Sequence, residues 1–227
     1  MNQYKSKYYS QHGEDFLLEK IFPDKKGFFV EIGCIDGKML SNTLHFEKKG
    51  WNGICIEAHP DYIDRLVINR PNSIVVHAAI TSHDIDEIIF YAKSEVALSS
   101  LEKPSKIGYR EYSVQGKSLT TVLSECNAKK IDFISIDIEG FESEALQGTD
   151  FTKFKPRVWV IECDDLKAKR KIDKILFSLG YYFIGMLFEN AFYSLDKGDK
   201  KLIEKKFVNI PLTHTQYFSN SLQIHCS

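Results

Sequence analysis

Short, almost uninterrupted runs of apolar residues are the feature that most narrows the possible folds of this chain. Five runs rich in β-branched and aromatic residues occupy residues 27–33, 53–58, 73–79, 131–138 and 157–163. Runs this short, without polar residues at every second position, are typical of strands buried on both faces of a parallel sheet. Because parallel neighbours need long crossover connections, the runs also predict helices between them.

Stretches with helical spacing lie where those crossovers are needed. In residues 167–179, Ile172, Ile175, Leu176 and Leu179 recur three and four residues apart, while Lys and Arg residues occupy the other face. The other predicted helices cover residues 14–22, 43–49, 61–70, 119–127 and 141–147. Alternation of strands and helices predicts an α/β domain.

Two parts of the chain depart from this alternation. Residues 181–187 and 191–195 are strand-like and separated by a short turn, which predicts an antiparallel hairpin at the far edge of the sheet. Residues 87–92 and 112–115 are also strand-like. The polar stretch 94–110 between them predicts an insertion or lid beside the binding site.

The composition is that of one globular domain. The chain has 227 residues, of which 43% are hydrophobic and 27% are charged, as is ordinary for a folded domain. We predict a single domain over residues 1–227, made of a helical segment 1–26, a core 27–195 and an extension 196–227. The formal net charge of −1 gives no overall basic field, so we expect no nucleic-acid partner.

Targeting signals and cysteine patterns are missing from the sequence. No run approaches the roughly 20 apolar residues that span a bilayer, and the first residues lack the apolar centre of a signal peptide. We therefore expect a cytoplasmic protein without a membrane partner. The 5 cysteines never form a C-x-x-C pair, which argues against a disulfide framework or a zinc site. We expect Cys34, Cys55 and Cys163 to be buried thiols.

The first predicted strand ends in a turn suited to ligand binding, since open parallel sheets bind ligands at the carboxyl ends of their strands. Gly33 and Gly37 allow a sharp turn and a close approach of the backbone, and Glu31 and Asp36 offer carboxylates to an amine or a hydroxyl. A dinucleotide fingerprint needs glycine at positions 35 and 38, which hold other residues. The turn therefore disfavours an NAD-dependent oxidoreductase.

The second predicted strand ends in Glu57, at the place where such folds hold an acid that accepts hydrogen bonds from ribose hydroxyls. A ribose without a pyrophosphate, combined with acids near Gly33 that can bind an amino-acid tail, describes S-adenosylmethionine.

Acidic residues also follow the fourth and fifth predicted strands. Asp137 and Glu139 lie two residues apart, so their side chains point to the same face of an extended chain. Glu162 and Asp164 end the next strand. Like charges held together raise each other's pKa, so such a cluster persists when it faces a cation, holds a metal or shares a proton. The alternative is that Glu139 and Glu142 lie on the solvated first turn of a helix.

Several motifs in order resemble one family. The run ISIDIEGFE at residues 134–142 and the opening SQHGED at residues 10–15 are similar to signatures of the FkbM family of S-adenosylmethionine-dependent methyltransferases. Further matches lie at residues 29–33, 41–43 and 50–57, and the resemblance runs from about residue 10 to residue 195. The sequence departs from the family pattern in two mild ways: Glu31 stands where many relatives carry Asp, and Cys34 stands where Ala is common.

The resemblance implies a fold, a cofactor and a substrate class. The fold would be a Rossmann-like class I methyltransferase, with helices on both faces of a mostly parallel seven-stranded sheet whose last strand is antiparallel. The acceptor would be a hydroxyl of a sugar or glycan. The residues implied to bind S-adenosylmethionine are Glu31, Gly33, Asp36, Gly37, Glu57 and Asp137, with Ala79 and Ile80 beside the adenine.

A sugar hydroxyl is a poor nucleophile, so the reaction needs a base or a Lewis acid. We predict Glu139 as the base, with Asp137 and Asp164 positioning it or binding a metal, and Glu162 and Asp165 as alternates. Asp137, Glu162 and Asp164 offer the oxygen ligands that Mg²⁺ or Mn²⁺ prefers. His12 and His214 compete as bases, because histidine titrates near neutrality. A module that binds the cofactor or a glycan without turnover is the alternative function.

Overall fold

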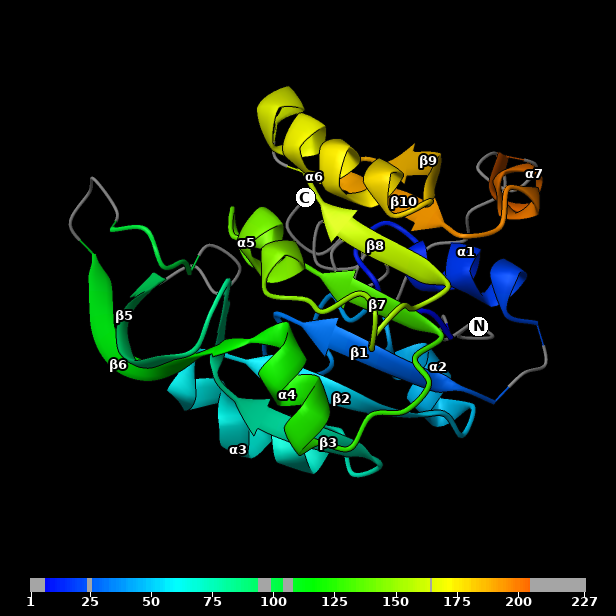
Figure 1. The fold of residues 1–227 in the computed structure, drawn as a ribbon. Coiled ribbons are helices and arrows are strands. Elements are labelled where there is room, and N and C mark those ends of the chain that lie inside the picture. Colours follow the sequence, from blue (N-terminus) through cyan, green and yellow to red (C-terminus); the bar gives the residue numbers. More distant parts are fainter. Residues whose placement is uncertain (1–6, 24–25, 94–98, 104–107, 164, 205–227) are drawn as a thin grey trace, which may run out of the picture.

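The computed structural model describes residues 7–23, 26–93, 99–103, 108–163 and 165–204 (Figure 1). Its main element is a seven-stranded sheet with the strand order β3-β2-β1-β7-β8-β10-β9. These strands are β1 (Phe28–Ile32), β2 (Asn52–Glu57), β3 (Ser73–His77), β7 (Phe133–Ile136), β8 (Val158–Glu162), β9 (Tyr182–Leu187) and β10 (Asn190–Ser194).

The sheet confirms the predicted fold class. Strands β3, β2, β1, β7 and β8 pair in parallel, whereas β10 runs antiparallel to both β8 and β9. The hairpin predicted near the end of the sequence is the pair β9 and β10, and β9 forms the far edge of the sheet. Strand order reverses beside β1, which places a binding crevice at the carboxyl ends of β1 and β7.

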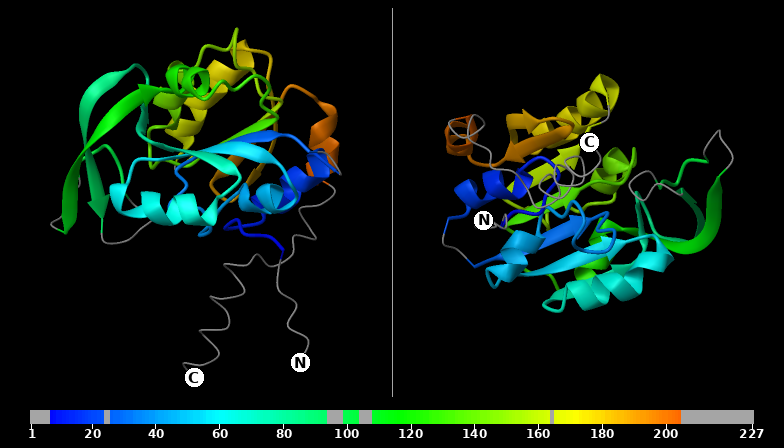
Figure 2. Two further views of the ribbon diagram at one scale, coloured as in Figure 1. Left: turned by 90° about the horizontal axis from the view of Figure 1, so that it is seen from below. Right: turned by 180° about the vertical axis from the view of Figure 1, so that it is seen from behind.

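Seven helices are seen in the described residues, and all the predicted ones are among them. They are α1 (Glu14–Ile21), α2 (Leu44–Lys48), α3 (Pro60–Asn69), α4 (Leu119–Glu125), α5 (Glu142–Gln147), α6 (Leu166–Ser178) and α7 (Gly198–Glu204). Helices α4, α5 and α6 cover one face of the sheet, and α1, α2 and α3 cover the other (Figure 2). None of these described helices is long and apolar enough to cross a membrane.

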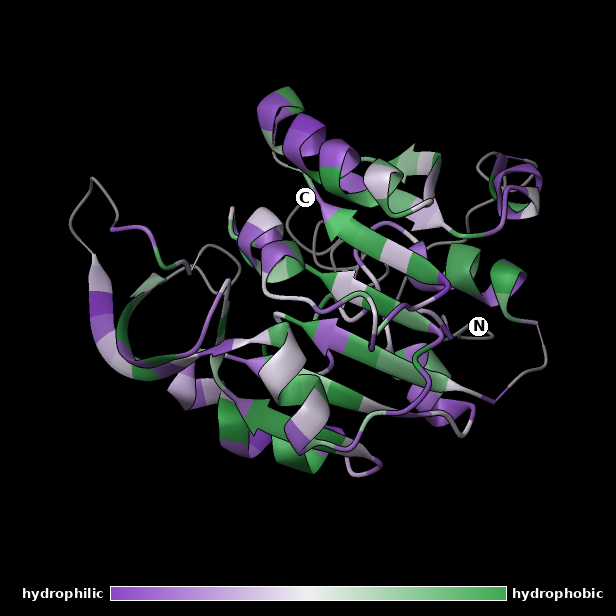
Figure 3. Ribbon diagram, in the orientation of Figure 1, coloured by the Kyte–Doolittle hydropathy of each residue, from purple (hydrophilic) through white to green (hydrophobic). Residues whose placement is uncertain are grey.

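Two cores result, because alternate residues of a strand point to opposite faces. In β1, Val30 and Ile32 join the core under α4, α5 and α6, whereas Phe29 joins the core under α1, α2 and α3. The central strands are accordingly mostly hydrophobic, apart from polar residues such as Glu31 of β1, while the visible side of α6 is largely hydrophilic (Figure 3). Cys34, Cys55 and Cys163 are buried free thiols, as predicted.

One predicted strand is wrong in extent. Residues 73–79 form two strands: β3 ends at His77, and the chain turns at Ala78 into β4 (Ala79–Thr81). Strand β4 belongs to a second sheet of three strands, in the order β4-β6-β5, with β5 (Ile85–Lys93) and β6 (Tyr109–Ser118). The strands predicted at 87–92 and 112–115 lie within β5 and β6.

The second sheet projects beyond the carboxyl ends of the main strands, at the left of Figure 1. Of the insertion predicted between its two long strands, residues 94–98 and 104–107 lie outside the described part, as do residues 205–227 of the predicted extension.

Candidate active site

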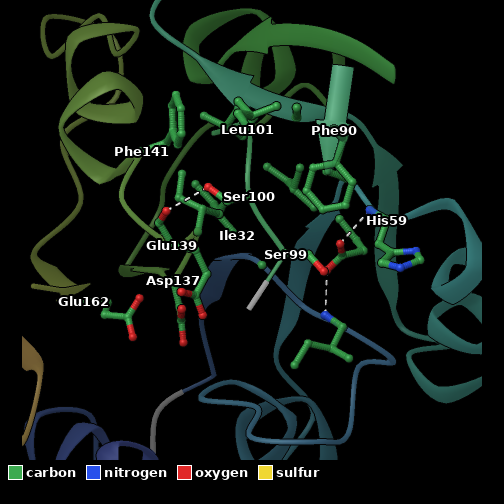
Figure 4. A pocket seen from close by; sticks show the side chains of 18 of the residues that line it. Ile32, His59, Phe90, Ser99, Ser100, Leu101, Asp137, Glu139, Phe141 and Glu162 are labelled. Carbon is green, nitrogen blue, oxygen red and sulfur yellow. Dashed lines mark hydrogen bonds between the residues drawn. The ribbon is translucent and has the colours of Figure 1, made fainter. Parts of the chain in front are cut away.

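A cavity of about 410 Å³ lies where the carboxyl ends of the main strands meet the second sheet (Figure 4). Its walls come from the turns after β1, β2, β7 and β8, from β4 and from residues 99–101. Three parts of it can be distinguished: a glycine turn, a wall around Glu57 and a cluster of carboxylates.

Gly33 marks the place where the turn after β1 touches the end of β7. Its φ is +86°, and a Cβ atom there would lie 1.8 Å from the carbonyl oxygen of Asp137. Any side chain would therefore push apart two neighbouring strand ends, and glycine also tolerates the positive φ. The turn that the sequence indicated as a ligand site is thus held close to the acidic loop.

Glu57 is fixed in the wall of the cavity by two backbone hydrogen bonds. Its Oε2 accepts from the Ile35 amide and its Oε1 from the His59 amide, both at 2.7 Å. Burial raises the pKa of this carboxyl to about 7, although the hydrogen bonds to the backbone oppose the shift. The group is therefore rigid, faces the cavity and titrates near neutrality.

Beside Glu57, small apolar residues face a group of rings. Ala79 and Ile80 line the cavity, as does His59, whose ring lies 4.5 Å from that of Tyr62 and 5.8 Å from that of Phe90. Burial lowers the pKa of His59 and so favours the neutral form of its ring. This part of the cavity suits a flat uncharged ring.

The carboxylates of Asp137, Glu139 and Glu162 converge at the other end of the cavity. One oxygen from each lies within 4.8 Å of the others, and all three residues are half-buried. Figure 4 shows these side chains turned toward one another. They meet because β7 and β8 are parallel neighbours whose carboxyl ends lie at the same edge.

Glu142 shapes the loop that carries this cluster. Its Oε1 accepts hydrogen bonds from the amides of Ile138 and Gly140, both at 3.1 Å, and burial raises its pKa to about 7. Between those amides, Glu139 has a φ of +54°, a conformation that residues with a side chain rarely adopt. The solvated helix start considered for Glu142 is therefore wrong: its carboxylate is buried and supports the loop.

Three residues predicted to bind the cofactor do not line the cavity: Glu31, Asp36 and Gly37. Glu31 points to the opposite face of β1, where it accepts hydrogen bonds from Thr43 at 2.8 Å and from Arg70 at 2.9 Å. The Asp36 carboxylate accepts from two amides of its own turn. A Cβ atom at Gly37 would lie 2.6 Å from Arg70, so this glycine serves packing.

His12 lies just outside the cavity. Its Nε2 is 3.1 Å from Oε1 of Glu189, and its ring stacks on that of Phe188 at 4.0 Å. Its neighbours Gln11 and Glu189 line the cavity. Asp165, predicted as an alternate to Asp164, caps α6, because its carboxylate accepts a hydrogen bond from the Lys167 amide. Asp164 and the alternative base His214 lie outside the described residues.

The sequence did not indicate several residues of the lining, among them Gln11, His59, Tyr62, Phe90, Ser99, Ser100, Leu101 and Glu189. Gln11 belongs to the opening motif, and residues 99–101 lie in the predicted insertion, so both segments were indicated without the particular residues. Phe90 and Glu189 carry no signal in the sequence that would separate them from core or surface residues.

The sequence model of the methyltransferase FkbM domain matches residues 31–183. The chain belongs to the FkbM methyltransferase family. It is therefore an S-adenosylmethionine-dependent methyltransferase, and the oxidoreductase alternative is set aside. The match spans the glycine turn, Glu57 and the acidic loop.

Several solved structures resemble this chain in fold at low sequence identity. An Aeropyrum pernix fibrillarin with bound S-adenosyl-L-methionine is 11% identical, with a TM-score of 0.47 and coverage of 86% of this FkbM protein and 84% of that chain. A precorrin-6y C5,15-methyltransferase from Geobacter metallireducens is 13% identical, with a TM-score of 0.44 and coverage of 79% and 84%. No curated protein sequence matches this chain.

Proposed function

We propose that this protein transfers a methyl group from S-adenosylmethionine to a hydroxyl of a sugar or glycan, with Glu139 as the general base. The observation that carries the proposal is the convergence of Asp137, Glu139 and Glu162 at one end of a cavity whose other end suits a nucleoside. A hydroxyl must lose its proton as it is methylated, and a carboxylate at that point can accept it.

The residues of the cavity fit the cofactor. Glu57 offers fixed carboxylate oxygens for the two ribose hydroxyls, and the wall of Ala79, Ile80 and His59 suits the adenine ring. Asp137, beside the Gly33 turn, can bind the amine of the methionine part. When bound, S-adenosylmethionine supplies an electrophilic methyl group on a sulfonium cation.

The acid cluster would attract the cationic sulfonium and accept the proton of the acceptor hydroxyl. Its negative charges favour a cation at this end of the cavity. While the methyl group passes from the sulfonium to the acceptor oxygen, the Glu139 carboxylate would accept the proton of that hydroxyl. Asp137 and Glu162 lie beside that carboxylate and compete with it for the proton.

The walls around the cluster support a carbohydrate acceptor. Leu101 and Phe141 line the side of the cavity above the carboxylates in Figure 4, and the Phe90 ring lies farther along the same wall, toward His59. A sugar has apolar C–H faces that pack on aromatic rings and hydroxyls that donate to carboxylates. The combination of rings on one side and acids on the other is the chemistry that such a molecule needs.

The same cluster supports a metal-assisted version of the reaction. Three carboxylates within 4.8 Å offer the oxygen ligands that Mg²⁺ and Mn²⁺ prefer. Of the predicted ligands, Asp137 and Glu162 take part and Asp164 lies outside the described residues, while Glu139 joins them. In this version the metal would make the hydroxyl more acidic, and the base would matter less.

A transfer assay tests the proposal. A panel of glycans is incubated with S-adenosylmethionine, and methylated products are detected by mass spectrometry for wild type, Glu139→Gln and the control Glu144→Gln on α5. The proposal expects a product methylated on oxygen and a loss of transfer in Glu139→Gln alone. Methylation on nitrogen or carbon would contradict it, as would cofactor binding without transfer to any glycan. A rate that rises with Mg²⁺ and falls with a chelator would support the metal-assisted version.

A further inference from the structure

The segment 99–103 connects the second sheet with the acidic loop through one serine. Ser100 pairs with Tyr91 of β5 by two backbone hydrogen bonds of 2.9 and 3.1 Å. Its side chain points toward the cavity, and its Oγ donates to the carbonyl oxygen of Glu139 at 3.0 Å (Figure 4). Ser100 is buried, with 8% of its surface exposed.

The direction of this hydrogen bond follows from the other partner of the hydroxyl. The Glu102 amide donates to the same Oγ at 3.3 Å, which uses a lone pair of the oxygen. A hydroxyl has a single proton, and the Glu139 carbonyl can only accept. The serine proton is therefore directed at Glu139.

Glu139 needs such a partner because its backbone is in a disfavoured conformation. Its φ is +54°, and the φ of the following Gly140 is +101°. Unfavourable backbone angles persist when surrounding groups fix them. On one side the Glu142 carboxylate binds the amides that flank Glu139, and on the other side Ser100 binds its carbonyl. Together they hold both the N–H and the C=O of the peptide group that follows the proposed base, and Glu142 also holds the Ile138 amide.

We infer that Ser100 is the positioning residue of Glu139, and that through it the acceptor wall of the cavity sets the direction of the base. This inference rests on the proposed function of Glu139. Ser99 and Leu101, on either side of Ser100, line the cavity. An acceptor that contacts residues 99–101 therefore contacts the segment whose Ser100 fixes the backbone of Glu139, and with it the direction of the Glu139 carboxylate. Loss of the serine hydroxyl frees the Glu139 carbonyl without removing any carboxylate.

Hydrogen exchange on the full chain tests the structural half of the inference. Ser100→Thr and Ser100→Val have the same shape and differ only in the hydroxyl, and Ser113→Ala removes a hydroxyl elsewhere in the second sheet that binds Glu87. We expect amides 138–142 to exchange about tenfold faster in the Val variant than in the Thr variant. Thr and Ser113→Ala should match wild type. Equal exchange in the Val and Thr variants would overturn the inference.

If the Val variant fails to fold, Ser100→Ala replaces it. Faster exchange confined to residues 99–103, with residues 138–142 unchanged, would then overturn the inference.

Steady-state kinetics test whether Ser100 positions the base. The Val variant should have a kcat about tenfold lower than wild type, with little change in cofactor affinity, and the Thr variant should have a normal kcat. Normal kcat in the Val variant, where Glu139→Gln is inactive, would overturn the positioning role alone. Full activity of Glu139→Gln would instead overturn the proposed base.

Discussion

At the scale of single residues, Glu57 combines a fixed geometry with an unusual proton affinity. Its carboxylate is buried and held by two amides, and its pKa is raised to about 7. The ionised form accepts hydrogen bonds from hydroxyls with both oxygens, whereas the protonated form has lost part of that capacity. Cofactor affinity should therefore depend on pH in the neutral range.

The expected sign follows from the raised pKa. Ionisation of Glu57 increases as pH rises through 7, so the affinity for S-adenosylmethionine should increase by about tenfold between pH 6 and pH 8. Glu57→Ala should weaken binding at pH 8 by about 1–3 kcal/mol, because the ribose hydroxyls lose their partner. Titration calorimetry measures both. Asp36→Asn is the matched control, since Asp36 lies outside the cavity, and unchanged affinity in Glu57→Ala would contradict the assignment.

Sequence predicted some site residues and misplaced others for a physical reason. The spacing of Asp137 and Glu139 places both on one face of an extended chain, and the structure brings them together. Glu31 and Asp36 border the same turn as Gly33, yet one carboxylate turns into a buried ion pair and the other into its own turn. The direction in which such a carboxylate points depends on partners distant in the sequence, such as Arg70, and no local pattern indicates them.

At the scale of elements, Arg70 joins three of them at the back of the glycine turn. It follows α3, and its side chain forms ion pairs with Glu31 of β1 at 2.9 Å and with Glu47 of α2 at 2.7 Å. Its side chain has no exposed surface. Breaking a buried pair by removing one partner leaves uncompensated charge, which costs far more than an exposed pair.

Removing this cation should destabilise the whole fold. We expect Arg70→Met to lower the free energy of unfolding by about 3–5 kcal/mol, because Glu31 and Glu47 lose their buried partner. Arg65→Met on the same helix is exposed and should change stability by less than about 0.5 kcal/mol. Urea denaturation followed by circular dichroism measures both. Equal stability of the two variants would show that the ion pairs contribute little.

Most elements followed from the sequence; helix α7 and the break between β3 and β4 did not, and the break has an identifiable cause. Strand and helix periods predicted the main sheet, because its strands are buried on both faces. The break between β3 and β4 was not predicted, since Ala78 and Ala79 continue the apolar run while changing the sheet to which the chain belongs. An apolar run indicates that its residues are buried, but it does not indicate which strand or sheet buries them. The second sheet, and with it the lining by Phe90 and Ser100, therefore required the structure.

At the scale of the whole molecule, a net charge of −1 conceals an uneven distribution. The described residues that line the cavity include Glu57, Asp137, Glu139, Glu162 and Glu189, and no Lys or Arg is among them. Basic residues gather instead at the opposite ends of β7 and β8, around a hollow lined by Lys129, Lys130, Lys153, Lys155 and Arg157. The lining of the cavity is therefore acidic.

This distribution predicts a preference among acceptors. A glycan that carries a phosphate or a carboxylate should be methylated with a kcat/KM about tenfold lower than its neutral counterpart, because like charges oppose its approach. The difference should shrink as salt is raised from 0.05 M to about 0.5 M, since mobile ions screen the field. Competition between paired acceptors, with products read by mass spectrometry, measures the ratio. A preference for the anionic member would contradict the prediction.

The role of Glu139 as the base is tested most directly by comparing turnover with cofactor binding in Glu139→Gln. The substitution keeps the shape of the side chain and removes its negative charge, so the account predicts a rate of methyl transfer lower by about 10²–10⁴. The affinity for S-adenosylmethionine should fall far less than the rate, because Glu57, the adenine wall and the other two carboxylates of the cluster are untouched. Near-full turnover in Glu139→Gln, with the cofactor still bound, would contradict the account.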